Sequence, residues 1–130
     1  MKSLLLATAL AAAAHAAPPP SFWMALNQVE TSGRTGAILG DNGRSLGPLQ
    51  ISRAYWLDSK VGVNYEQVID LQFAIKVASA YMRRYEPAAF DAGNVDVLAR
   101  LHNAGPGWRR KLTATENYVA KVRQEMERAK

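Results

Sequence analysis

No cysteine occurs among the 130 residues of this chain, and histidine occurs only twice. A disulfide framework and a thiolate metal site are therefore excluded, and two histidines form no recognisable metal-binding set. At this length the sequence predicts one domain that buries an apolar core without covalent cross-links. We expect neither a metal nor another cofactor.

Internal repeats, strong basic runs and long apolar runs are also missing. The net charge of +5 favours an anionic partner by long-range attraction. The Lys and Arg residues are scattered until the C-terminal tail, however, and this argues against nucleic acid as the partner. The longest apolar run, at the N-terminus, is shorter than the about 20 residues that span a bilayer, so we expect no stable membrane insertion.

Residues 1–16 have the three parts of a secretory signal in order. Lys2 gives the charged start, residues 3–14 are apolar, and Ala14-His15-Ala16 matches an A-x-A cleavage site. An N-terminal core helix or a membrane anchor is the alternative interpretation. We expect a secreted or periplasmic protein with a cleaved signal at 1–16, a Pro-rich leader at 17–20 and one domain at 21–130.

The stretch from Glu30 to Ile51 organises the rest of the chain. A helix is predicted from Ser21, as its N-cap, to about Thr31, with Glu30 at the edge of its apolar stripe. A carboxyl group that lies half in an apolar wall and half in a cleft favours its protonated form, so it can act as a general acid. Taken from the residues alone, a solvated carboxylate at a helix end is the favoured interpretation of Glu30.

Asp41-Asn42-Gly43 predicts a tight hairpin within this stretch, because Asn-Gly suits the positive φ angles that such a turn requires. The hairpin would return Gln50 and Ile51 towards the helix that carries Glu30. Four further helices are predicted: one over 52–58, a long one that starts at an Asn64/Gln67 capping box and ends at Pro87, one over 95–102 capped by Asn94, and a last one that starts at a capping box over 113–116.

Four short motifs carry a resemblance to a known superfamily: Glu30-Thr31-Ser32-Gly33, Gly47-Pro48-Leu49-Gln50-Ile51, His102-Asn103-Ala104-Gly105-Pro106-Gly107, and Thr115-Glu116-Asn117-Tyr118-Val119. Their order and spacing resemble the lysozyme-like superfamily, in lytic transglycosylases (the SLT-like domain) and in invertebrate-type (destabilase) lysozymes. His102 stands where the transglycosylase motif has Tyr, and the invertebrate lysozymes are rich in cysteine. The resemblance implies a mostly α, lysozyme-like α+β fold: a single helical domain with a small β-hairpin beside the active-site cleft.

The resemblance also implies an activity on peptidoglycan, the expected partner of a monomeric enzyme. A lytic transglycosylase would cleave the β-1,4 bond between N-acetylmuramic acid and N-acetylglucosamine, with Glu30 as general acid and base, and release 1,6-anhydro products. The alternative is a hydrolytic lysozyme that uses Glu30 and Asp41, although Asp41 could simply open the Asp-Asn-Gly turn. A second alternative is a non-catalytic wall-binding module.

Further site residues follow from the same motifs. The resemblance implies that Ser32, Gln50, Asn103 and Tyr118 position the sugar or Glu30, although Gln50 and Asn103 could equally satisfy buried backbone groups. Tyr55 could line the cleft or belong to the core, because aromatic side chains serve both. His102 is required by neither mechanism, and we interpret it as a structural or rim residue.

Overall fold

The computed structural model describes residues 17–62 and 64–130, so the predicted signal at 1–16 lies outside the described part. In chain order the elements are helix α2 (Pro20–Thr31), strands β1 (Leu39–Gly40), β2 (Ser45–Leu46) and β3 (Ile51–Ser52), helix α3 (Arg53–Ser59), 3-10 helix η1 (Tyr65–Ile69), helices α4 (Leu71–Tyr85), α5 (Pro87–Ala92) and α6 (Val95–Ala104), 3-10 helix η2 (Trp108–Arg110) and helix α7 (Leu112–Arg128). The predicted fold class, mostly helical with a small antiparallel sheet, is confirmed.

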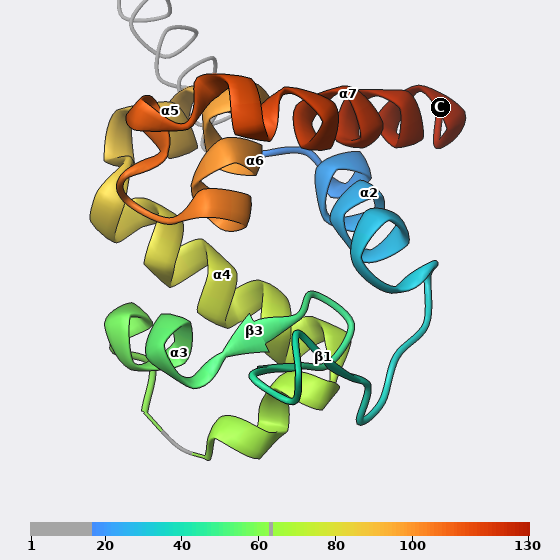
Figure 1. The fold of residues 1–130 in the computed structure, drawn as a ribbon, viewed down its shortest axis with the longest axis vertical. Helices are drawn as coiled ribbons and strands as arrows, with labels where there is room; N and C mark the ends of the chain where they lie inside the picture. The colour runs from blue at the N-terminus through green and yellow to red at the C-terminus, as the bar shows by residue number, and fades with distance from the viewer. Residues whose placement is uncertain (1–16, 63) are drawn as a thin grey trace, which may run out of the picture.

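Helices α2, α6 and α7 lie at one end of the molecule, and the sheet lies at the other (Figure 1). Helix α7 packs against α2 and α6 at one end, whereas α3 packs against α4 beside the sheet at the other (Figure 1). Apolar side chains from all of these regions form one buried core: Phe22, Leu26, Leu49, Ile51, Val68, Val77, Met82, Leu98, Leu101 and Val122. Within the described part of the chain, no helix combines the length and the apolarity that crossing a membrane requires.

The predicted hairpin is present and is extended by a third strand. Asp41, Asn42 and Gly43 all have positive φ angles, of 52°, 57° and 82°. Asn, Asp and Gly tolerate this region better than other residues, so the local sequence favours the turn. The strands pair antiparallel in the order β1-β2-β3, with Leu46 opposite both Leu39 and Ile51. The chain therefore returns from the hairpin towards α2, as the sequence predicted.

Several helix boundaries were predicted correctly. Helix α2 ends at Thr31 as expected, and Asn94 accepts a hydrogen bond from the Val97 backbone N–H as the cap of α6. The predicted N-cap role of Ser21 is wrong. Helix α2 begins one residue earlier with Pro20 in its first turn, and its cap Pro19 makes no side-chain hydrogen bond. Proline suits that position because its fixed φ and missing N–H cost nothing there.

The long helix predicted from Asn64 is interrupted. Residues 65–69 form the 3-10 helix η1, whose cap Asn64 makes no side-chain hydrogen bond. The backbone is then extended at Asp70, whose carboxylate accepts a hydrogen bond from the Phe73 N–H and starts α4. Asp70 is the stronger cap because an ionised carboxylate both accepts this bond and suits the positive end of the helix.

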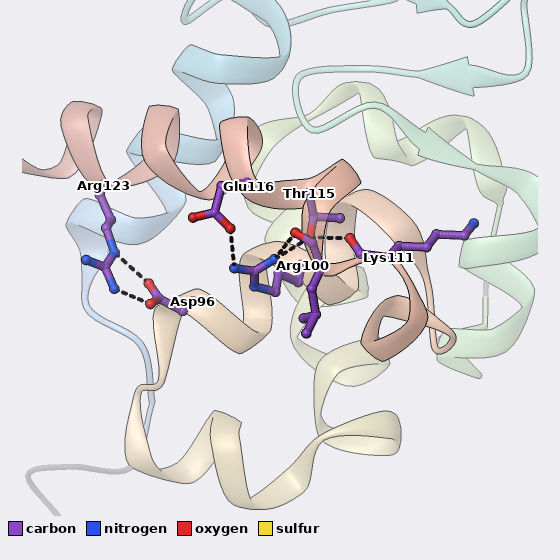
Figure 2. A network of polar contacts seen from close by, with 7 residues as sticks. Asp96, Arg100, Lys111, Thr115, Glu116 and Arg123 are labelled. Atoms are coloured by element: carbon purple, nitrogen blue, oxygen red, sulfur yellow. Dashed lines mark hydrogen bonds and ion pairs between the residues drawn. The ribbon is translucent and has the colours of Figure 1, made fainter.

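The capping box predicted over 113–116 is also wrong, because α7 starts at Leu112 and Thr115 lies inside it, buried. The Thr115 hydroxyl bonds the Lys111 carbonyl oxygen and receives a hydrogen bond from Arg100. Figure 2 shows Arg100 between Thr115 and Glu116, with Asp96 of α6 paired to Arg123 of α7 beside them. These contacts fix α7 against α6, and so fix the helix that carries Tyr118.

Candidate active site

Glu30 lies in the last turn of α2, at the edge of its buried face. Phe22 and Leu26 on that face are fully buried, whereas the Glu30 side chain keeps 19% of its surface exposed. Helix α2 ends directly after it, because Ser32 adopts a left-handed conformation with φ of 57°. The local sequence therefore places this carboxyl mostly buried, at the boundary between the buried face of α2 and solvent.

A buried polar cluster ties the end of α2 to the segment after the hairpin. The Asn27 amide donates to the Thr31 hydroxyl at 3.0 Å and to the Arg34 carbonyl oxygen at 2.9 Å. The Thr31 hydroxyl in turn donates to the Pro48 carbonyl oxygen at 2.9 Å. Both side chains are almost fully buried, so these bonds fix the position of α2 relative to residues 47–51.

The Gly47-Pro48-Leu49-Gln50-Ile51 segment approaches η1 too closely for a side chain at Gly47. A Cβ there would lie 2.2 Å from the Val68 carbonyl oxygen, and φ of Gly47 is +83°. Gln50 also has a positive φ, of 53°, and its amide nitrogen donates to the carbonyl oxygens of Ile38 and Gly47 at 3.0 and 2.9 Å. Gln50 thus satisfies backbone groups, one of the two roles left open by the sequence.

A cavity of about 440 Å³ lies between the helical end and the sheet, and its lining is mostly polar. This volume is within the usual range for small-ligand sites. The lining residues are Glu30, Asp41, Ser45, Gln50, Ser52, Tyr55, His102 and Asn103. A larger hollow of about 590 Å³ lies at the junction of η1 and α4, but it contains none of the predicted site residues.

Tyr118 reaches Glu30 from α7. Its hydroxyl donates a hydrogen bond of 2.6 Å to Oε2 of Glu30. Burial raises the pKa of the Tyr118 phenol well above its ordinary value, and the Glu30 carboxyl adds to that rise. The phenol therefore stays neutral and remains a hydrogen-bond donor over the whole physiological pH range.

His102, which the sequence interpretation made a structural or rim residue, lines the cavity. Its side chain is only 2% exposed, and Nε2 lies 3.7 Å from Oε2 of Glu30. Nε2 also lies 3.0 Å from the Leu49 carbonyl oxygen, and Nδ1 lies 2.8 Å from the Tyr55 hydroxyl. The signal that could have found it is the motif itself, because His102 occupies a position of the third motif where the transglycosylases have another polar aromatic residue, Tyr.

Tyr55 combines the two roles that the sequence left open. Its ring is buried and stacks on Tyr81 with a centroid separation of 3.6 Å and an interplanar angle of 9°. Tyr55 also lines the cavity, and its hydroxyl contacts His102. Burial raises the pKa of the Tyr55 phenol, and Tyr81 and Glu30 contribute further to the rise.

The structure brings Asp41 to the cavity but not Ser32. The Asp41 side chain is 63% exposed and pairs with Arg44 at 3.4 Å in the hairpin loop. It therefore both belongs to the turn and lines the cavity opposite the α2 end. Ser32 is exposed at the end of α2 and does not line the cavity. Ser45 and Ser52, on neighbouring strands, line it without having been predicted.

No side-chain cluster in the described part of the chain could hold a metal ion through three or more His, Asp or Glu residues. The site consists instead of two carboxyl groups, one imidazole, hydroxyl groups and amides around one polar cavity. Such a set can move protons and bind hydroxylated ligands.

Comparison with known proteins identifies the class of fold. A chain in the crystal structure of Aeromonas hydrophila PliI in complex with Meretrix lusoria lysozyme superposes with a TM-score of 0.68 and 25% identity, over 82% of this chain and 89% of that chain. The crystal structure of Tapes japonica lysozyme gives a TM-score of 0.62 and 26% identity, over 77% and 87% of the two chains. The chain therefore has the lysozyme-like fold.

Sequence comparison points to the same proteins. The lysozyme of Ostrea edulis is 38% identical over 69 residues, which are 50% of this chain and 50% of that protein. Lysozyme 1 of Crassostrea virginica is 33% identical over 86 residues, 65% of this chain and 46% of that protein. The chain spans about half the length of these curated relatives, which are homologues of the invertebrate lysozyme type. No protein-family model matches the chain.

Proposed function

We propose that this protein is a lysozyme that hydrolyses the β-1,4 bond between N-acetylmuramic acid and N-acetylglucosamine in peptidoglycan. The observation that carries the proposal is the half-buried Glu30 carboxyl, which shares one polar cavity with the exposed Asp41 carboxyl. Similarity to proteins named lysozyme in both sequence and fold supports it.

The two carboxyl groups suit the two tasks of glycoside hydrolysis. In lysozyme, a carboxyl in an apolar wall donates a proton to the leaving oxygen, and a second, solvated carboxylate stabilises the positive sugar centre or attacks it. Glu30 suits the first task, since its side chain is mostly buried at the end of α2 and lines the cavity. Asp41 suits the second, since most of its side chain is in contact with solvent.

The hydrolytic mechanism replaces the lytic transglycosylase mechanism that the motifs first favoured. The relatives and structural neighbours are named lysozymes, and this supports the hydrolytic alternative better. Transglycosylation remains a second candidate because of one observation. The hydrogen bond from Tyr118 to Glu30 links the first and last of the transglycosylase-like motifs, and that mechanism requires only the Glu30 carboxyl.

We further propose that the protein is secreted and acts as a monomer on an anionic cell wall. The sequence at 1–16 has the order of a cleaved signal. The net charge of +5 favours encounter with wall polymers of negative charge without a single essential contact.

Digestion of purified peptidoglycan tests the proposal. We expect the wild type to release fragments with a hydrated reducing end, which differ by one water molecule from 1,6-anhydro fragments in mass spectrometry. Glu30→Gln keeps the shape of the side chain but cannot donate a proton, so it should fold normally and lose nearly all cleavage. Asp41→Asn should also cause a large loss, because a second carboxylate acts in the transition state of hydrolysis.

Three results would contradict the proposal in different ways. Substantial cleavage by Glu30→Gln would remove Glu30 from the acid role. Anhydro ends, together with a mild effect of Asp41→Asn, would establish the transglycosylase mechanism instead. If the wild type bound peptidoglycan without cleaving it, the protein would be a non-catalytic wall-binding module.

A further inference from the structure

The register of the sheet turns the side chain of Ser45 towards the cavity. Ser45 of β2 lies directly opposite Gly40 of β1 and Ser52 of β3. Residues opposite each other in antiparallel strands share one face of the sheet, and their neighbours along each strand point to the other face. The neighbouring pair, Leu46 and Ile51, packs with the core. The face that carries the two serines is therefore turned away from the core, and both serines line the cavity.

The end of this face at β1 is occupied by the side chain of Gln50. A Cβ on Gly40 would collide with Oε1 of Gln50, so this oxygen takes the space of a side chain at position 40. The Gln50 nitrogen is held by the carbonyl oxygens of Ile38 and Gly47. Ser45 thus lies in the middle of a polar row, between a fixed amide and a second serine.

The two serines differ in what their hydroxyl groups already bind. Oγ of Ser52 accepts a hydrogen bond from the Tyr55 N–H at 3.1 Å, as the N-cap of α3. The Ser45 hydroxyl makes no hydrogen bond to the described part of the chain, and it is not a buried atom: among these residues, Nε1 of Trp56 is the only buried side-chain nitrogen or oxygen without a partner. Ser45 therefore offers a solvated donor and acceptor at the cavity.

We propose that Ser45 is a substrate-binding residue, whose hydroxyl forms a hydrogen bond with a hydroxyl group of the sugar ring that binds between the sheet and Glu30. The proposal rests on the glycosidase function proposed above. A sugar hydroxyl both donates and accepts, as the serine hydroxyl does. No Lys or Arg is among the described residues that line the cavity, so this wall suits a neutral part of the substrate.

This contact should affect substrate binding and not the chemical step. The hydrogen bond joins two neutral groups, and neither of them gains charge while the glycosidic bond breaks. An interaction that is equally strong in the ground state and in the transition state lowers KM and leaves kcat unchanged. The net free energy of one neutral hydrogen bond corresponds to roughly 2- to 10-fold in affinity.

A serine that is merely solvated is the competing explanation, because the face of an antiparallel sheet that is turned away from the core is usually polar. In that case the hydroxyl would exchange hydrogen bonds with water both before and after the substrate binds. Its removal would then change neither KM nor kcat, so the two explanations predict different kinetics.

Ser45→Val and Ser45→Thr form a matched pair for the kinetic test. Both side chains have nearly the same shape and suit a strand, but only threonine keeps the hydroxyl. With soluble peptidoglycan fragments, we expect Ser45→Val to have a KM roughly 2- to 10-fold above that of Ser45→Thr, with little change in kcat. Equal KM values in the pair, or a loss confined to kcat, would overturn the proposal.

Ser79→Ala is the control, because Ser79 is a half-buried serine of α4 that does not line the cavity. It should leave KM and kcat unchanged. If Ser79→Ala raised KM as much as Ser45→Val does, the effect would not come from a contact with the substrate, and the proposal would be overturned.

A binding measurement separates this proposal from the proposed function. Isothermal titration calorimetry with soluble, peptide-free glycan fragments of peptidoglycan measures affinity without cleavage when both substitutions are made in Glu30→Gln. We expect weaker binding with Ser45→Val than with Ser45→Thr. Equal affinities, or no binding by either, would overturn the proposal. The expected difference together with an inactive wild type would instead reject the hydrolytic function and leave the Ser45 contact standing.

Discussion

At the scale of single residues, the contact between Tyr118 and Glu30 joins positions 88 residues apart in the chain. Its 2.6 Å length is typical of a hydroxyl that donates to a carboxylate. Burial and the neighbouring carboxyl raise the pKa of Tyr118, so deprotonation never removes this donor near neutral pH. The bond therefore orients Glu30 in both of the charge states through which an acid catalyst passes.

Tyr118→Phe should reduce the turnover of peptidoglycan and leave the fold intact. A hydrogen bond to a charged group contributes about 1.5–3 kcal/mol, which corresponds to roughly 10- to 100-fold in kcat. Tyr85→Phe is the matched control, because the Tyr85 hydroxyl donates to the Asp58 carboxylate at 3.0 Å, away from the cavity. Equal activity of the two variants would show that the Tyr118 hydroxyl does not assist Glu30.

Recognisable motifs predicted part of the candidate site but not all of it. Glu30 and Gln50 were expected at the cavity because each lies in a motif, and Asp41 because it opens the hairpin. His102 was assigned only a structural or rim role, because the residues around it come from three other segments and no local pattern in the sequence joins them. Ser32 shows the converse, because its place in a motif did not bring it to the cavity: α2 ends in a left-handed turn there.

At the scale of elements, the site depends on how firmly α2 is held against the segment after the hairpin. Asn27 and Thr31, one helical turn apart on α2, both bond the carbonyl oxygen of Pro48. This contact is buried, so neither partner can be replaced by water. Because Glu30 directly precedes Thr31, the same bonds determine where the acid lies relative to the sheet.

Thr31→Val should destabilise the protein and reduce cleavage together. Valine keeps the shape of the side chain but leaves the Pro48 carbonyl oxygen and the Asn27 amide short of a partner, at a cost of about 1–3 kcal/mol. Thr35→Val is the control, because that hydroxyl bonds the Ile69 carbonyl oxygen in an exposed position and should change stability by less than about 0.5 kcal/mol. Urea unfolding at constant m-value measures both. Similar losses in the two variants would contradict the role given to the buried cluster.

The elements themselves were largely predictable, since apolar spacing and turn residues are local signals. The predicted helix starts were wrong where two residues could cap the same helix, or where the expected capping side chain makes a tertiary contact instead. Asp70, and not Asn64, is the N-cap of α4. Arg100 engages the Thr115 hydroxyl inside α7, where the sequence alone favours a cap (Figure 2). No periodic pattern in the sequence predicts either contact.

At the scale of the whole molecule, Glu86 joins the end of α4 to η2 and makes stability depend on pH. Arg109 donates to both of its oxygens, at 2.8 and 3.2 Å, and the Trp108 indole donates to Oε2 at 3.0 Å. The hydrogen bonds from Arg109 lower the pKa of Glu86 below its usual value, burial opposes this, and Trp108 lowers it further. The side chain of Glu86 is only 14% exposed, whereas that of Arg109 is 64% exposed.

A carboxyl whose pKa is lowered by folding binds more protons in the unfolded state, so unfolding becomes harder as pH rises. The stability that Glu86 adds is fully present at pH values above the ordinary Glu pKa of about 4.3. It is lost as pH falls through the lower pKa that Glu86 has in the folded protein. Arg109→Gln should therefore lower the free energy of unfolding at pH 7, because the Glu86 carboxylate loses both hydrogen bonds from the guanidinium. This deficit relative to the wild type should begin to shrink as pH falls below the ordinary Glu pKa of about 4.3, and should disappear as pH falls through the lower folded pKa of Glu86. Arg110→Gln makes the same change in net charge at the neighbouring exposed position, and it should shift stability by less than about 0.5 kcal/mol at either pH.

Chemical denaturation at several pH values measures all three proteins. A deficit for Arg109→Gln that stayed constant with pH, or one that Arg110→Gln reproduced, would show that overall charge and not the Glu86 contact controls the acid stability of the protein.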